Sequence, residues 1–239
     1  MTKSNLAESP ATAYTYTYIH SVRGNQVDII GVHHTDKPAV YEAVLNVMEA
    51  RIAGGAVVHY EGLRESCRSE YGVTPPAVAR RAGRIMGAIE LLAQHSLDTH
   101  PEFVRQWEVL GPADTWKNYD VTELDLASRI GGFAAYAYAL GNEAVRQPFF
   151  RPLYGIMAGS WQGKPIRKAL ARVLHLNIGK ALLDDRNDVA LDAHDRLQEE
   201  HPGASLVMLW GLSHAEGLGR GLRARNYESV GRTAIRAAS

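Results

Sequence analysis

Two motifs of the same form, far apart in the chain, contain histidines that could do chemistry. Gly31-Val32-His33-His34 and Gly211-Leu212-Ser213-His214 each follow an apolar run with the length of a strand. Each motif then leads directly into a helical pattern of apolar residues. The carboxyl ends of parallel strands share one edge of a sheet, and open α/β folds bind ligands at that edge. We therefore expect His34 and His214 to lie on the same rim.

A glutamate and an arginine complete the candidate catalytic set. Glu61 follows the apolar run 56–60, and the strand, helix and strand up to this point have the spacing of a βαβ unit, which puts Glu61 at the same edge as His34. Arg186 lies on the apolar stripe of a predicted helix, where a buried guanidinium must pair with a carboxylate or a bound anion. Neighbouring polar side chains add three candidate substrate-binding residues, His33, Tyr60 and Asn187.

Two imidazoles, a carboxylate and a guanidinium suit two kinds of hydrolysis. In the first, His34, Glu61 and His214 bind a divalent metal such as Mn, Co or Zn, whose bound water becomes nucleophilic near neutral pH. In the second, one histidine acts as general base without a metal, Glu61 orients it and Arg186 stabilises an oxyanion. The sequence contains neither the Gly-x-Ser-x-Gly elbow of serine hydrolases nor a His-Glu-x-x-His helix. Both routes predict cleavage of an acyl bond.

The surrounding pattern predicts the elements that must position these residues. Alternating tyrosines and threonines over 12–19 predict a strand that pairs antiparallel with 27–31 as a hairpin. Apolar residues every four positions predict a helix from about Pro38 to Gly54. A long helical pattern covers 165–201, and the chain closes with a short helix and a strand over 227–230. The predicted fold class is α/β (α+β), with a mixed central sheet, a parallel βαβ core and flanking helices.

One structural domain with three sections accounts for these elements. Residues 11–63 form the first α/β half, with the hairpin and the βαβ unit, and residues 166–239 form the second half. Helical patterns at 77–95 and 124–140 predict that residues 64–165 are a helical insertion covering the carboxyl edge of the strands. A separate helical domain is the alternative for that section.

Composition narrows the classes of partner. The chain has 239 residues, 46% of them hydrophobic, and equal totals of 26 Lys+Arg and 26 Asp+Glu, so no basic excess favours nucleic acid. The first ten residues are polar, and no stretch approaches the ~20 apolar residues that span a bilayer. Cys67 is the single cysteine, so no disulfide framework within the chain is expected. We expect a cytoplasmic protein with a peptide or small-molecule substrate and neither nucleic-acid nor membrane partners; a homo-oligomer stays open.

Four segments resemble the TraB/PrgY/TIKI-like group, also called the GumN family, which is distantly related to erythromycin esterase and the ChaN haem-iron protein. Ile29–His34 is similar to the family's first strand with its Gly-x-x-His ending, and Val57–Glu61 to its second strand ending in glutamate. Asp185-Arg186-Asn187 resembles its Glu-Arg-Asn helix motif, and Trp210–Leu218 its closing Gly-x-x-His and Gly-Leu pattern. The resemblance covers roughly both ends of the chain and leaves the middle unaligned.

The resemblance implies an α/β core with a helical insertion and a site built from His34, Glu61, Arg186 and His214. Within the group, TIKI proteins are described as metal-dependent proteases, erythromycin esterases as metal-independent hydrolases and PrgY as a regulator of a peptide pheromone. The expectation is a TIKI or erythromycin-esterase type of hydrolase acting on a peptide, amide or ester bond. The alternative is a non-catalytic protein that sequesters a peptide, a small ligand or haem, in which aromatic side chains matter more, namely Trp107, Trp116, Tyr154 and Trp161.

Overall fold

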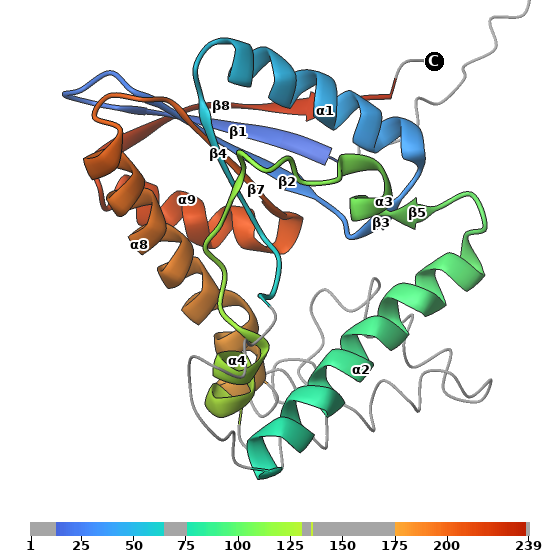
Figure 1. The fold of residues 1–239 in the computed structure, drawn as a ribbon. Coiled ribbons are helices and arrows are strands. Elements are labelled where there is room, and N and C mark those ends of the chain that lie inside the picture. The colour runs from blue at the N-terminus through green and yellow to red at the C-terminus, as the bar shows by residue number, and fades with distance from the viewer. Residues whose placement is uncertain (1–12, 65–75, 131–134, 136–174, 238–239) are drawn as a thin grey trace, which may run out of the picture.

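The computed structural model describes residues 13–64, 76–130, 135 and 175–237 (Figure 1). A mixed sheet of six strands in the order β6-β4-β7-β2-β1-β8 forms their centre. The strands are β1 Ala13–His20, β2 Gln26–Val32, β4 Val57–Tyr60, β6 Lys117–Asn118, β7 Leu206–Gly211 and β8 Tyr227–Ile235. Strands β2, β7, β4 and β6 are parallel to one another, and β1 is antiparallel to both neighbours. The predicted mixed α/β class is confirmed.

Helices cover both faces of this sheet. They are α1 Pro38–Ala53, α2 Pro76–Thr99, α3 Gln106–Leu110, α4 Glu123–Arg129, the π-helix η1 His175–Asp184, α8 Asp185–Glu200, the short 3-10 helix η2 Leu212–His214 and α9 Ala215–Arg223. A second, two-stranded sheet pairs β3 Thr35–Asp36 with β5 Val104–Arg105. Over the residues described, no helix has the length and apolar character needed to cross a membrane.

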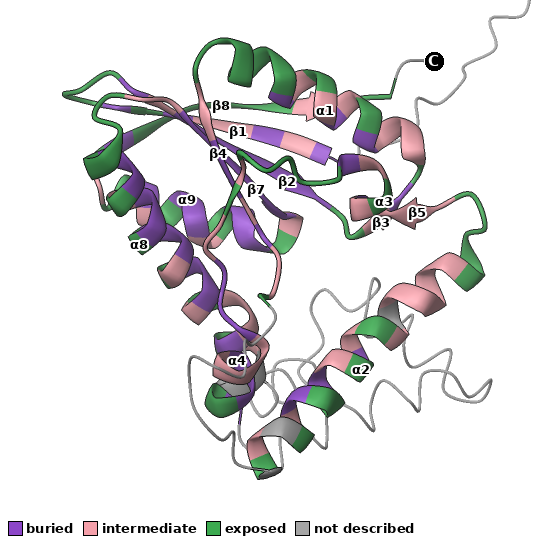
Figure 2. Ribbon diagram, viewed as in Figure 1, coloured by how far each residue is buried: buried purple, intermediate pink, exposed green. Residues whose placement is uncertain are grey.

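Strands β2 and β7 contribute to two hydrophobic cores at once, one on each face of the sheet. Successive side chains of a strand point to opposite faces. Ile29 and Met208 therefore pack with α8 and α9, whereas Ile30 and Leu209 pack with α1. This double burial explains why β7 reads as an unbroken apolar run, and why β2 is buried at every residue from Val27 to Val32 although it contains Asp28. Figure 2 shows the buried strands between helices whose outer faces are exposed.

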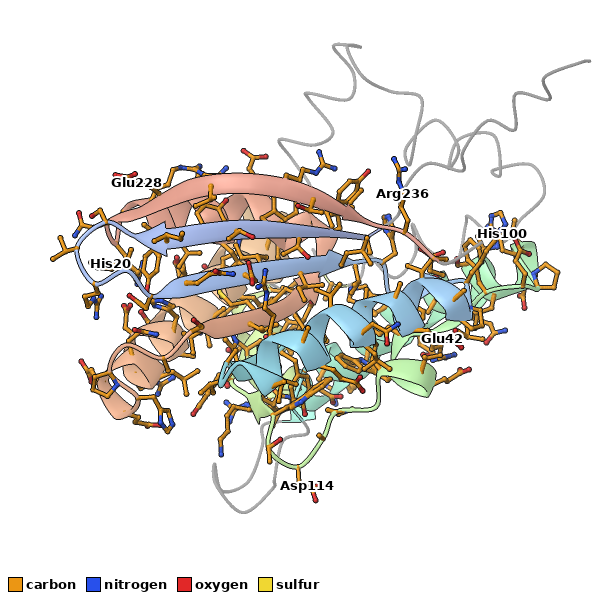
Figure 3. All side chains as sticks on the ribbon, turned by 90° about the horizontal axis from the view of Figure 1, so that it is seen from above. His20, Glu42, His100, Asp114, Glu228 and Arg236 are labelled. Atoms are coloured by element: carbon orange, nitrogen blue, oxygen red, sulfur yellow. The ribbon has the colours of Figure 1, made fainter. Side chains whose placement is uncertain are left out.

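The predicted hairpin and the βαβ unit are both present. Tyr14 lies opposite Gly31 in the β1–β2 pair, and α1 connects β2 to β4, with β7 inserted between those two strands. The closing strand runs to Ile235 rather than Val230, because residues 231–235 also pair with β1. Most side chains of this strand are exposed. Figure 3 shows the two ends of the sheet, with His20 at the hairpin end and His100 beyond the opposite, carboxyl end of β2.

The section predicted as a helical insertion contains strands as well as helices. β6 joins the main sheet beside β4, and β5 pairs with β3, so this section is tied to the core at two places. α2 has nearly its predicted span and forms one wall beyond the carboxyl edge. α4 begins where predicted and ends at Arg129, with Ile130 as its C-cap. Outside the described residues lie 131–134 and 136–140 of the predicted helix, together with Cys67, Tyr154 and Trp161.

His59 makes the stability of the fold sensitive to acid. Its ring is fully buried, accepts a hydrogen bond from Trp210 Nε1 at 3.4 Å through Nδ1, and leaves Nε2 without a partner among the described residues. Burial, assisted by the charge of His194, lowers the pKa of His59 from 6.5 to about 3. The unfolded chain takes up this proton below pH 6.5 and the folded chain does not. The free energy of unfolding therefore falls between pH 6.5 and 3, by up to about 1.4 kcal/mol per pH unit for this one group.

Urea unfolding at several pH values between about 7 and 4 measures this effect. In the variant His59→Leu, the free energy of unfolding is expected to change less steeply with pH, by the amount that corresponds to the uptake of about one proton. The control His100→Gln, in a half-exposed side chain, is expected to keep the wild-type slope. Equal slopes in His59→Leu and the wild type would show that His59 is protonated while buried.

Candidate functional site

A cleft of about 880 Å³ lies beyond the carboxyl ends of β2, β4 and β7. His34, Glu61 and His214 follow these three strands in turn, so the common edge brings them together as predicted. The polar part of the lining is His33, His34, Thr35, Asp36, Glu61, Ser96, His100, Gln106, Arg186, Ser213 and His214. Helix α2 and the end of η1 supply an apolar wall that includes Met86, Ile89, Ala93, Leu182 and Leu183.

A buried carboxylate–guanidinium–carboxylate group forms the floor of the cleft. Arg186 donates from Nη2 to Glu61 Oε1 at 2.6 Å, and from Nε and Nη2 to the two oxygens of Asp120 at 2.9 and 2.5 Å. Glu61 Oε2 accepts the backbone N–H of Gly211 at 2.5 Å, and Asp120 accepts the N–H of Gly62 at 3.1 Å. This group joins the ends of β4, β6 and β7 to the start of α8.

The charges of this group support one another. Burial alone would raise the pKa of Glu61, but the Arg186 guanidinium and hydrogen bonding with His214 hold it well below its usual value. Burial opposes the charge of Arg186, yet the carboxylates of Glu61 and Asp120 raise its pKa further above its ordinary value. Glu61 is therefore an anion at neutral pH.

Gln106 orients His34 through two contacts. The Gln106 backbone N–H donates to the carbonyl of His34 at 3.0 Å, and its side-chain Oε1 lies 3.2 Å from His34 Nδ1. An amide oxygen only accepts, so the ring proton of His34 sits on Nδ1 and Nε2 keeps its lone pair. His34 Nε2 is 3.9 Å from Glu61 Oε1, and the side chain is 59% exposed to the cleft.

Asn187 contacts the ring of His214 on the side away from Glu61. Asn187 Oδ1 lies 2.8 Å from His214 Nδ1, and His214 Nε2 is 3.5 Å from Glu61 Oε1. The two histidines thus present the same nitrogen to the same carboxylate oxygen, His34 from the exposed side and His214 from the buried side. Such an arrangement can accept a proton, donate one after protonation, or bind a cation.

Two glycines permit these close approaches. A Cβ at Gly211 would lie 2.9 Å from Glu61 Oε2 and 3.3 Å from His34 Nε2. A Cβ at Gly217 would lie 2.1 Å from Asn187 Nδ2. The glycine of the second Gly-x-x-His motif is therefore required by the carboxylate it faces.

Gly217→Ala is expected to disturb the site while leaving the fold in place. The added methyl group displaces Asn187 and frees His214 Nδ1, which should lower turnover about 10- to 100-fold, as loss of such supporting contacts does in metal sites. Nitrogen NMR of the imidazole rings and the turnover number measure it. The control Gly83→Ala lies in α2 with nothing within 4 Å of its new Cβ. Unchanged turnover and an unchanged His214 signal in Gly217→Ala would contradict the role of Asn187.

The donor set fits a divalent metal. In the part of the chain that the structure describes, no three His, Cys, Asp or Glu side chains are already arranged as a metal cluster. Two imidazole nitrogens and a carboxylate oxygen are nevertheless the ligand types that Mn, Co and Zn use. The hydrogen bonds from Nδ1 to amide oxygens are those that metal-bound histidines commonly make. His34, Glu61 and His214 are the residues that would hold such an ion.

Not every predicted residue reaches the cleft. His33 lines it with an exposed side chain, and Asn187 acts from behind His214. Tyr60 instead packs edge-on against Trp107 and Trp116, at 5.4 and 6.3 Å between ring centroids, and is absent from the described lining.

Sequence reasoning missed Gln106 and Asp120. Asp120 follows a strand of two residues, which is too short to produce a periodic pattern. The sequence does contain a helix-start signal next to Asp120. Thr122 caps α4 by accepting the N–H of Asp125, and such a cap marks a turn of the chain. Gln106 had no such signal, since its role depends on the β3–β5 pairing that brings it to His34.

No protein-family model matches this chain, and neither the curated proteins nor the solved structures contain a match to it.

Proposed function

We propose that this protein is a hydrolase that cleaves a peptide, amide or ester bond in the cleft. The observation that carries the proposal is the convergence of two imidazole Nε2 atoms on one buried, ionised carboxylate oxygen at the wall of a large cleft. The resemblance of the strand and helix motifs to the TIKI and erythromycin-esterase group supports the same chemistry. We place the activity in the cytoplasm, in keeping with a chain whose single cysteine forms no internal disulfide framework.

His34 acts as the general base. Its ring is exposed to the cleft, and its Nδ1–H is held by Gln106, so Nε2 can take a proton from a water molecule that attacks the acyl carbon. The protonated His34 then returns this proton to the leaving group, while His214 supports Glu61 from its buried side. Glu61 stabilises whichever imidazole is protonated, and Arg186 keeps Glu61 ionised and fixed.

Arg186 is a positioning residue in this scheme. Its donors are directed at Glu61, Asp120 and the Leu182 carbonyl, and its side chain is 8% exposed. A group so occupied does not stabilise an oxyanion directly. It sets the orientation and charge of Glu61 instead.

His34, Glu61 and His214 would also hold Mn, Co or Zn. A bound divalent ion would supply a water molecule of lowered pKa as the nucleophile. Metal analysis by plasma mass spectrometry separates the two routes. Near-stoichiometric metal that disappears in the double variant His34→Ala/His214→Ala supports the metal route, and no uptake after addition of the ions supports the general-base route.

Hydrolysis of a panel of uncharged esters, anilides and short peptides tests the proposal. The wild type is expected to turn over at least one class, and Glu61→Gln, which keeps the shape but removes the charge, is expected to be ~10²-fold slower or worse. Equal rates for Glu61→Gln and the wild type would remove the carboxylate from the mechanism.

The apolar wall of the cleft favours a second candidate, a protein that binds and sequesters a ligand. Trp107 lines the cleft, while Trp116 supports Tyr60 from behind. Under this alternative, ligand affinity survives in His34→Ala/His214→Ala and falls in Trp107→Ala. Under hydrolysis the double variant loses turnover.

A further inference from the structure

The described residues that line the cleft carry an excess of negative charge although they include an arginine. Asp36 and Glu61 line it, and Asp120 lies directly behind Arg186. Arg186 is the only lining residue with a permanent positive charge in the described part of the chain. Two carboxylates therefore line the cleft beside one guanidinium, and a third carboxylate pairs with that guanidinium from behind.

Arg186 is not available to an anionic ligand. Its Nε and Nη2 donate to Asp120 and Glu61, and Nη1 faces the Leu182 carbonyl at 3.5 Å. A carboxylate entering the cleft would have to displace one of two buried carboxylates from this guanidinium. Leaving a buried carboxylate unpaired is costly, so the exchange is unfavourable.

Asp36 extends the negative charge away from the floor. It is buried at 4% exposure, accepts the Lys37 backbone N–H at 2.7 Å, and forms no salt bridge with a described basic side chain. It follows His34 by two residues in β3 and lines the same cleft. The nearby Tyr41 hydroxyl has a raised pKa, mainly through burial and then through the charge of Asp36.

The opposite wall is apolar. Met86, Ile89 and Ala93 repeat along one face of α2, and Leu182 and Leu183 continue the surface at the end of η1. An alkyl or aromatic group of a ligand gains affinity by burying its apolar surface against such a wall. The cleft thus combines an apolar surface with a carboxylate-rich floor.

We propose that the cleft selects substrates with an apolar group and no negative charge, and that it prefers a cationic amine to a carboxylate at the polar end. That the selected ligands are substrates rests on the proposed function, whereas the preference itself is a property of binding. Charges a few ångströms apart near a protein surface interact through a high effective dielectric, so ~10-fold differences in affinity are the expected scale.

Three ligands of equal chain length test the preference: hexylamine, hexanamide and hexanoate. Each is titrated into the full chain at about pH 8, above the ordinary imidazole pKa of about 6.5. Carbon-labelled methionine methyl groups report binding, because Met86 lines the cleft whereas Met48 and Met208 are fully buried in the two cores. The expected order of affinity is hexylamine, then hexanamide, then hexanoate, with about 10-fold or more between the first and last.

Asp36→Asn supplies the matched variant. The amide keeps an oxygen for the Lys37 N–H and removes one charge, so the ratio of hexylamine to hexanoate affinity should fall several-fold while hexanamide affinity stays the same. Equal affinities for the three ligands, or preference for hexanoate, would overturn the inference. No response of Met86 to any ligand would also overturn it, since the apolar wall would then bind nothing.

The outcome separates this inference from the proposed function. Loss of hydrolysis in His34→Ala with the charge preference retained supports both. A charge preference in a protein without hydrolytic activity keeps the selectivity and rejects the enzyme. Hydrolysis that is faster for anionic esters than for cationic ones rejects the selectivity and keeps the enzyme.

Discussion

Arg186→Met is expected to destabilise the fold by about 3–5 kcal/mol at neutral pH, because it leaves two buried carboxylates without their shared cation. Methionine fills a similar volume and removes the hydrogen bonds to Glu61 and Asp120. Those bonds connect β4, β6 and α8, so their loss affects three segments at once. Urea denaturation followed by circular dichroism measures the change.

The pH dependence of this loss identifies its cause. The pKa of Glu61 in the folded chain is well below its ordinary value of 4.5, so its ionised form stabilises the native state above that value. This contribution disappears as the pH falls through the lowered pKa. In Arg186→Met, burial without the guanidinium raises the pKa of Glu61, and protonation then relieves the unpaired charge, so the difference from wild type should shrink as the pH falls from neutral through 4.5.

Arg129→Ala is the matched control for Arg186→Met. Arg129 is 39% exposed and lies 3.7 Å from Asp185, one residue before Arg186. A surface pair of this kind contributes ~0–1 kcal/mol. Similar destabilisation in the two variants, or a loss in Arg186→Met that does not change with pH, would show that packing rather than charge holds the floor together.

His34→Ala is expected to lower turnover by ~10²–10⁴-fold with little loss of stability, because it removes the general base from an exposed position. His33→Ala provides a close control. His33 is the adjacent exposed residue and also lines the cleft, but it is not directed at Glu61 by any described contact. Its variant should keep turnover within a few-fold of wild type. Equal losses of turnover in the two variants would indicate that either substitution disturbs the whole segment between β2 and β3.

The sequence predicted the convergence of the site because strand ends are readable from sequence. Apolar runs 27–30, 57–60 and 206–210 are long enough to indicate strands, and the parallel βαβ rule then places His34, Glu61 and His214 on one edge. The buried Arg186 was also predictable, since its position in an apolar stripe required a charged partner.

The contacts that tune the site were not predictable in the same way. Asp120 reaches Arg186 only because a two-residue strand joins the sheet beside β4. Gln106 reaches His34 through the small β3–β5 sheet, and Asn187 reaches His214 across the space between two helices. Tyr60 does not join Glu61 in the cleft, because alternation turns it toward the core that contains Trp107. Local propensity contains none of these long-range pairings.

The central claim is that His34, Glu61 and His214 form one hydrolytic unit. The most direct test measures kcat and KM for the wild type, His34→Ala, His214→Ala and the double variant on the best ester or amide of the panel. We predict activity that co-purifies with the wild-type chain, a large fall in kcat for each single variant, and little further fall in the double variant, since residues acting as a unit are not additive. Losses that multiply in the double variant, or activity that persists in it, would contradict a shared mechanism.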